Sequence, residues 1–219
     1  MNTRKSKLLK QTSLKLLIVV CLFLLALFVF AFIAQEAVLE QEDTFDKTVS
    51  TFFTQHATGG WIKIMRDFTF FGSSYFLFPA YAILVGYFVI RKRYTYAMNI
   101  SIIVISSFLI MQGLKQLFHR QRPEFPIIKG ITSYSFPSGH TLSSFIFCSI
   151  LAYLVLQGTL SKIWKLLLSA ALLFFAITIG MSRIVLNVHY TTDVIAGFCL
   201  GVMWVILSFG IFKKMNMDT

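Results

Sequence analysis

The chain has 219 residues, of which 57% are hydrophobic and only 13% charged, and its mean hydropathy is +0.75. This balance is far from that of a water-soluble globular domain and predicts an integral membrane protein. The formal net charge is +11, but the basic residues are divided among short segments between apolar stretches, so we expect no nucleic-acid partner.

Six stretches of the sequence are apolar enough to cross a bilayer as helices, since a hydrocarbon core of about 30 Å takes about 20 residues. Their length and lack of polar alternation favour helices over barrel strands. We therefore predict an all-α, polytopic membrane protein, with six transmembrane helices in one bundle and residues 1–219 as a single domain. The stretches are residues 16–34, 75–90, 97–114, 142–156, 164–181 and 194–212.

The first stretch follows a basic tail, residues 1–15, that contains five Lys and Arg residues and no acid. A cleavable signal peptide also begins in this way. However, this apolar run is longer than a typical signal core, and no convincing small-x-small cleavage site follows it. We expect a retained membrane anchor.

Basic residues also follow the second, fourth and sixth stretches. These are Arg91, Lys92 and Arg93, then Lys162 and Lys165, and then Lys213 and Lys214. With six crossings, these clusters and the basic tail lie on one side, which the positive-inside rule identifies as the cytoplasm. We expect both termini to be cytoplasmic, in a plasma or bacterial inner membrane. The outer side then receives residues 35–74, 115–141 and 182–193.

Residues 35–74 form the longest outer connection, and residues 44–71 within it are amphipathic. Phe45, Val49 and Phe53 fall on one helical face, and a second apolar face follows a pair of glycines. This pattern predicts two short amphipathic helices at the outer membrane surface. They either pack over the bundle or serve as a lid or a guide for lipid.

The first polar cluster is KQLFHRQRP, in which Lys115 and Arg122 are seven residues apart. Seven residues are about two helical turns, so both cations would project from one face if the third helix continued that far. Snorkelling of these side chains would anchor the helix end in the interface. Since topology requires no basic residues on the outer side, they are also candidate binding residues.

The second cluster is PSGH, which leads into the fourth helix. Ser138 is a natural N-cap, and Gly139 lets the backbone approach another group closely. A capped helix start explains these two residues, but it does not explain His140. The free amides of a helix N-terminus bind phosphate well, so this cluster is a candidate anion site.

The third cluster is SRIVLNVHYTTD, in which Ser182 and Arg183 end the fifth helix and His189 and Asp193 open the sixth. His189 and Asp193 are four residues apart, so the carboxylate can hydrogen-bond one imidazole nitrogen and orient the other. A nucleophilic or basic histidine is held in this way. For an isolated pair, helix capping is the alternative.

The two histidines and Asp193 are ligand types that also suit zinc. However, Lys115, Arg122 and Arg183 would surround the metal with positive charge. The same cations suit a tetrahedral oxyanion, because guanidinium groups offer forked donors to phosphate oxygens. We therefore predict an anion site without a metal or other cofactor.

Together, the three clusters resemble the tripartite signature of the type 2 phosphatidic acid phosphatase superfamily, in order and with full spacing. The matching residues are Lys115, Arg122, Pro123, Pro137, Ser138, Gly139, His140, Ser182, Arg183, His189 and Asp193. The motifs cover residues 115–193, and the six-helix layout extends the resemblance over nearly the whole chain. The resemblance implies a metal-independent phosphatase that acts on membrane lipids.

The resemblance also implies a role for each residue. His189 would be the nucleophile that forms a phosphohistidine, Asp193 would orient it, and His140 would be the general acid that protonates the leaving oxygen. The expected phosphate-binding groups are Lys115, Arg122, Arg183, Ser138 and the amide of Gly139.

We therefore expect hydrolysis of a lipid mono- or diphosphate at the outer face of the membrane. Phosphatidylglycerophosphate, phosphatidic acid and undecaprenyl diphosphate are the candidate substrates. One alternative is a phosphotransferase that passes the phosphate to another lipid or a sugar, including lipid A phosphate chemistry. Another is a non-catalytic lipid-binding protein or transporter.

Overall fold

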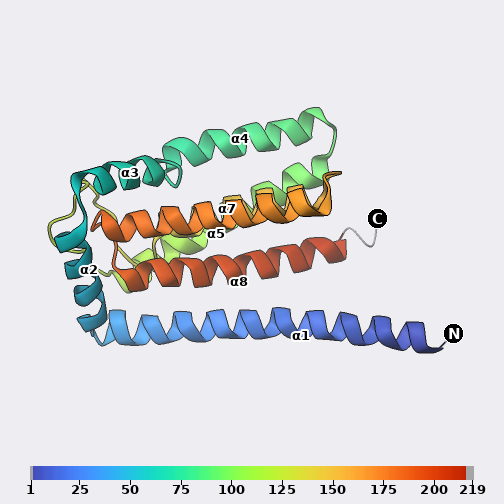
Figure 1. Ribbon diagram of the computed structural model, residues 1–219, viewed down its shortest axis with the longest axis horizontal. Coiled ribbons are helices and arrows are strands. Elements are labelled where there is room, and N and C mark those ends of the chain that lie inside the picture. The colour runs from blue at the N-terminus through green and yellow to red at the C-terminus, as the bar shows by residue number, and fades with distance from the viewer. Residues whose placement is uncertain (1, 216–219) are drawn as a thin grey trace.

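The computed structural model describes residues 2–215, and the side chains of residues 14–210, as a bundle of α-helices (Figure 1). Within this part of the chain, six segments are long and apolar enough to cross a membrane. They are Leu14–Leu39, Gly59–Ile90, Tyr94–Phe118, Gly139–Gln157, Lys162–Val185 and Thr191–Gly210. The prediction of six membrane helices is confirmed.

The helices are α1 (Asn2–Ile33), which continues into a π-helical turn η1 (Ala34–Leu39), then α2 (Thr44–His56), α3 (Gly59–Phe70), α4 (Ser74–Ile90), α5 (Tyr94–Phe118), α6 (Gly139–Gln157), α7 (Lys162–Val185) and α8 (Thr191–Met215). The predicted basic tail, residues 1–15, runs into α1 from residue 2 onward. The side chains of Arg4, Lys5, Lys7, Lys10, Lys213 and Lys214 lie outside the described residues.

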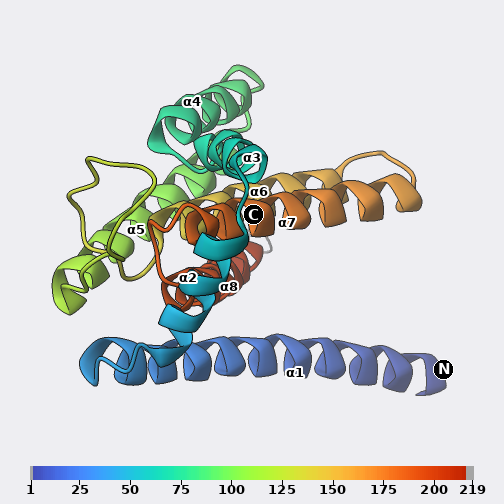
Figure 2. The same cartoon turned by 60° about the vertical axis from the view of Figure 1, so that its left-hand side comes forward.

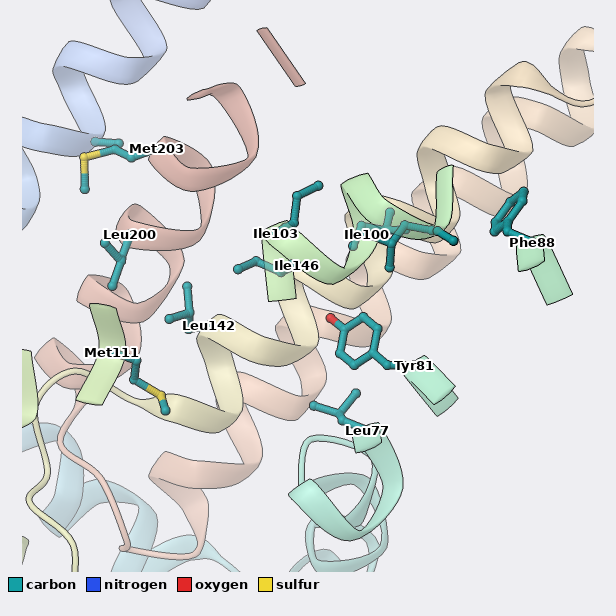
Figure 3. Close-up of a cluster of buried hydrophobic side chains, with 13 residues drawn as sticks. Leu77, Tyr81, Phe88, Ile100, Ile103, Met111, Leu142, Ile146, Leu200 and Met203 are labelled. Carbon is teal, nitrogen blue, oxygen red and sulfur yellow. The ribbon is translucent and has the colours of Figure 1, made fainter. Parts of the chain in front are cut away.

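The core of the bundle forms around α6, which packs against α4, α5, α7 and α8. Leu142 and Ile146 of α6 are 1% exposed and meet Leu77 of α4, Met111 of α5 and Leu200 of α8 (Figure 3). α1 packs on α8 at the edge of the bundle, as Figures 1 and 2 show. Because α6 lies inside the bundle, its first turn is held by several neighbouring helices.

The two ends of the bundle differ in what they carry. One end holds the start of α1, the end of α8, the α4–α5 turn with its three basic residues and the start of α7 (Figure 1). The other end holds α2, the connection between α5 and α6, and the α7–α8 turn. The basic turns therefore lie together, as the sequence predicts. That they face the cytoplasm stays a prediction.

Two helices were predicted in residues 44–71, and α2 and α3 form there. α2 lies across the end of the bundle between α1 and α3 (Figure 2). α3 differs from the prediction of a surface helix, because it leads into α4 within the second membrane-length segment and packs on α7. Its apolar face causes this placement, since Met65 packs with Val185 and Phe68 contacts the ring of Phe175.

A close approach between α8 and α6 fixes where α6 begins. A Cβ atom at Gly197 of α8 would lie 2.9 Å from the carbonyl oxygen of Ser138 and 3.1 Å from Cβ of Thr141. No larger residue fits without a shift of the first turn of α6. The glycine thus holds the PSGH motif against α8.

Replacing Gly197 with alanine should therefore destabilise the protein by about 1 to 3 kcal/mol through overpacking. Gly113→Ala of α5 is the matched control, because a Cβ there would meet no atom within 4 Å apart from its chain neighbours and the backbone of its own helix. We expect a lower apparent Tm in detergent for Gly197→Ala, and an unchanged or slightly higher one for Gly113→Ala, since alanine favours a helix. Equal melting of the two variants would contradict the packing argument.

Candidate active site

A cavity of about 330 Å³ opens among α4, α5, α6 and α7. Its polar wall joins all three sequence clusters, although they are far apart in the chain. Six of the eight predicted site residues line it: Lys115, Arg122, Gly139, His140, Arg183 and His189. Asp193 lies behind His189, and Ser138 is fully buried beside the cavity without lining it.

His189 lies in the turn before α8, with Asp193 one turn further on. Nδ1 of His189 is 3.4 Å from Oδ2 of Asp193, and Nε2 is 3.0 Å from Nη1 of Arg122. A guanidinium nitrogen can only donate, so Nε2 is the acceptor and the proton is on Nδ1, which faces the carboxylate. Ser135 supports this arrangement, because its hydroxyl donates to Oδ2 of Asp193 at 2.5 Å and lies 3.3 Å from Nδ1.

The side chain of His189 is 2% exposed. Burial lowers its pKa from 6.5 to about 3, against the opposing effect of Asp193. The ring is therefore neutral at pH 7, with its lone pair on Nε2. The prediction of an oriented, neutral histidine agrees with this geometry.

Three cations line the cavity, and each is held by hydrogen bonds to neighbouring groups of the protein. Lys115 donates to the carbonyl oxygens of Tyr134 and Ser135, and Nη1 of Arg183 donates to Oγ1 of Thr69 at 2.5 Å. Nε of Arg183 is buried and has no partner among the described residues.

Arg122 is the most tightly held of the three cations. Its Nε donates to the carbonyl oxygen of Ser133 at 2.8 Å, and its Nη1 donates to the carbonyl oxygen of Val188 at 2.6 Å. Burial lowers the pKa of Arg122 from its ordinary value, yet a guanidinium remains charged at neutral pH. The side chain thus brings a fixed positive charge to within hydrogen-bond distance of Nε2 of His189.

Arg122 reaches the cavity by a route that differs from the prediction. α5 does not continue through the motif but ends at Phe118, and the next residue, His119, is left-handed with φ of 49°. Arg122 therefore lies in the connection after α5. The chain turns back there, because the amide of Ser135 donates to the carbonyl oxygen of Arg120 at 2.8 Å.

The first turn of α6 forms another part of the wall, to which Gly139 and His140 contribute. A Cβ at Gly139 would lie 2.6 Å from the sulfur of Met111, so a larger residue there would require the Met111 side chain to move. Ser138 is the N-cap residue, but the prediction that its side chain caps the helix is wrong. Its hydroxyl instead accepts a hydrogen bond from Thr141 at 2.9 Å.

Two buried charged residues that were not singled out in the sequence support the site. Nη1 of Arg120 lies 2.7 Å from Oδ1 of Asp193, and Nη2 lies 2.8 Å from Oδ2 of Asp46 on α2. Asp46 is 1% exposed. A charged residue on the apolar stripe of α2, three residues before Val49 and seven before Phe53, is the signal that marks it.

A membrane-embedded helical bundle with a cation-lined cavity and an oriented neutral histidine defines a membrane protein whose site is suited to a tetrahedral oxyanion. The comparisons with known proteins agree with this class. The model of the PAP2 superfamily matches residues 96–217. The chain therefore belongs to the PAP2 superfamily and is a phosphatase of that superfamily.

A curated relative is phosphatidylglycerophosphatase B of Bacillus subtilis (strain 168), which is 32% identical over 157 residues, covering 70% of this chain and 76% of the relative. The crystal structure of a transmembrane PAP2 type phosphatidylglycerolphosphate phosphatase from B. subtilis matches with a TM-score of 0.76 and 30% identity, over 90% of this chain and 96% of that one. Aquifex aeolicus LpxE shares the fold, with a TM-score of 0.60 and 23% identity over 77% of this chain and 97% of that one.

Proposed function

We propose that this protein hydrolyses the phosphate from a membrane lipid, through a phosphohistidine and without a metal, at the outer face of the membrane. One observation carries the lipid assignment. The cavity that holds the cations continues between α4 and α5, where its wall is apolar and includes Leu77, Phe78, Val104 and Phe108. A phosphate head group and a hydrocarbon tail fit these two regions.

The substrate phosphate would bind among the three cations and the amide of Gly139. Its oxygens would take over the Nη1 donor of Arg122, which frees the lone pair on Nε2 of His189. Phosphoryl transfer depends mainly on such positioning and on neutralising the oxygen charge. Ser138 does not line the cavity, so we propose that it contributes by holding the first turn of α6.

In the first step, Nε2 of His189 attacks phosphorus, the N–P bond forms and the P–O bond to the lipid breaks. His140 gives its proton to the leaving oxygen, while Nδ1 keeps its proton against Asp193. In the second step, water attacks the phosphorus and gives its proton back to His140. The N–P bond breaks, its electron pair returns to Nε2, and inorganic phosphate leaves.

The relative's name makes phosphatidylglycerophosphate the first substrate to test, with phosphatidic acid and undecaprenyl diphosphate beside it. The outer location is supported by the separation of the cavity from the basic turns, which lie at the opposite end of the bundle (Figure 1). In this proposed topology, both termini would lie in the cytoplasm.

We expect the purified protein in detergent to release inorganic phosphate from at least one of these lipids in the presence of EDTA, with inhibition by vanadate. Glycerol 3-phosphate should react far more slowly, because it lacks a tail for the apolar region. Absence of release from every lipid would contradict the proposal. Radiolabel found in an added lipid or sugar would instead show transfer, and loss of activity in EDTA that one metal restores would show a metal enzyme.

A pair of variants on α5 separates lipid recognition from chemistry. Val104→Trp fills the apolar region of the cavity, so it should raise KM for the lipid but leave the turnover of p-nitrophenyl phosphate nearly unchanged. Ile105→Trp is the control, because that side chain is 60% exposed on the outside of the same helix. Equal effects of the two variants would count against a tail-binding region.

A further inference from the structure

Behind the site, Arg120 joins two buried carboxylates. Its Nη1 contacts Oδ1 of Asp193 at 2.7 Å and its Nη2 contacts Oδ2 of Asp46 at 2.8 Å. The side chain of Arg120 is 8% exposed, and those of the two acids are 1% exposed or less. The guanidinium also lies 4.3 Å from the centre of the Tyr190 ring. A planar fork held in this way cannot rotate without breaking an ion pair.

Asp46 is fixed in turn by the start of α8. Its Oδ1 accepts from the amide of Thr192 at 2.9 Å, and its Oδ2 accepts from the hydroxyl of Thr192 at 2.5 Å. Asp193 is the next residue along α8. The two carboxylates thus lie on either side of Arg120, one from α2 across the end of the bundle (Figure 2) and one from α8.

Fold stability alone does not explain this cluster. The free energy of desolvating a guanidinium and two carboxylates offsets much of their attraction. Well-packed apolar side chains in their place often stabilise a protein equally well. The cluster instead supplies direction and charge. Arg120 contacts the oxygen of Asp193 that does not face His189, and leaves Oδ2 for the Nδ1 proton.

We propose that Arg120 and Asp46 are positioning residues, which hold Asp193 in register with Nδ1 of His189 and keep the His189–Asp193 pair from binding a second proton. This inference rests on the proposed role of His189 as the nucleophile. Asp46 balances the charge of Arg120, so the three groups together carry one negative charge beside the imidazole. Although burial opposes its charge, the carboxylates of Asp193 and Asp46 raise the pKa of Arg120, which therefore stays charged.

The sign of the pH effect follows from the charges around the pair. Removing Arg120 removes a cation beside Asp193, so the pair binds a proton more readily. As the pH falls, Nε2 is then protonated, and lost as a nucleophile, at a higher pH than in the wild type. Removing the charge of Asp46 has the opposite sign. The other charged or titratable groups that face the pair stay in place in both variants: Lys115 on α5, Arg122 after α5, His140 on α6 and Arg183 on α7.

The test compares kcat and KM from pH 2 to 9 for Arg120→Met, Arg120→Lys, Asp46→Asn and the Arg120→Met/Asp46→Asn double variant. We expect Arg120→Met to lower kcat at pH 7 about 10- to 100-fold, as for residues that orient a reactive ligand, with KM changed less than about threefold. Its acidic limb should move up by about one pH unit or more, whereas that of Asp46→Asn should move down or stay.

Two features separate positioning from a merely structural role. The double variant should recover part of the kcat lost in Arg120→Met, because it removes one charge of each sign. Arg120→Lys should be intermediate, since an ammonium keeps the charge but not the fork. Asp43→Asn is the matched control, because this acid also lies near the start of α2 but pairs with Lys47 at the surface, and its profile should equal that of the wild type.

An Arg120→Met protein that is folded, with the acidic limb and kcat of the wild type, would overturn the inference. If Arg120→Met does not fold, an acidic limb that moves up in Asp46→Asn would overturn it equally. Inactive wild type, or an active His189→Ala variant, would instead mean that the proposed function has failed. An active wild type with an inactive His189→Ala and an unshifted Arg120→Met would remove this inference alone.

Discussion

Replacing His189 with alanine is expected to lower the release of inorganic phosphate from the lipid substrate by about 10⁴-fold or more, to the level of the assay background. The variant loses the Nε2 lone pair that forms the covalent intermediate, and no other described side chain pairs a neutral imidazole with a buried carboxylate. Losing a nucleophile in an enzyme with a covalent intermediate has effects of this size. Initial rates with purified protein in detergent measure it.

His56→Ala is the control for this substitution, because His56 is exposed on α2 and contacts the carbonyl oxygen of Phe52. A second measurement addresses the intermediate itself. Rapid quenching with labelled substrate should give protein-bound label that is stable in alkali and labile in acid, as a phosphoamide is, and His189→Ala should carry none. Substantial activity in His189→Ala would remove this residue as the nucleophile.

Replacing His140 with alanine is expected to lower kcat for a lipid monoester about 10²- to 10⁴-fold, the usual range for a general acid. The loss should be much smaller with p-nitrophenyl phosphate, because p-nitrophenolate leaves without a proton. His189→Ala should be inactive toward both substrates. The ratio of the two rates for each variant therefore distinguishes proton donation from attack on phosphorus.

An equal loss on both substrates would contradict the role of His140 as the general acid and would favour a role in holding the phosphate. In that case KM for both substrates should rise as well. The comparison is valid only if His140→Ala is folded, which a melting curve in the same detergent measures. A Cβ atom at Gly72 would lie 3.2 Å from Cδ2 of His140, so the ring packs closely against Gly72. Its removal in His140→Ala therefore leaves a defined cavity.

The sequence predicted most of the fold, because hydrocarbon thickness and the distribution of basic residues leave few arrangements of six apolar stretches. It also predicted which residues gather at the site. Lys115, Arg122, His140, Arg183 and His189 line one cavity, and their spacing and positions at helix ends were sufficient to group them.

The parts that were not predicted depend on contacts that no local pattern contains. The left-handed His119 ends α5 before Arg122, and helical periodicity gave no sign of it. The pairing of Arg120 with Asp46 spans 74 residues, so each residue alone resembled an ordinary interfacial charge. Asp46 on the apolar stripe of α2 was a visible conflict with amphipathicity, and such conflicts often mark functional or supporting residues.

The contact between Arg122 and Nε2 of His189 has a consequence for when the imidazole can react. The lone pair that would attack phosphorus accepts a hydrogen bond from Nη1 of Arg122 at 3.0 Å. This contact protects Nε2 from protonation by solvent and from reaction with other electrophiles. If His189 is the nucleophile, only a ligand that is a better acceptor for the guanidinium exposes it. Binding of the substrate phosphate to Arg122 would then itself free the reactive nitrogen, so His189 could attack only a phosphate that is already bound.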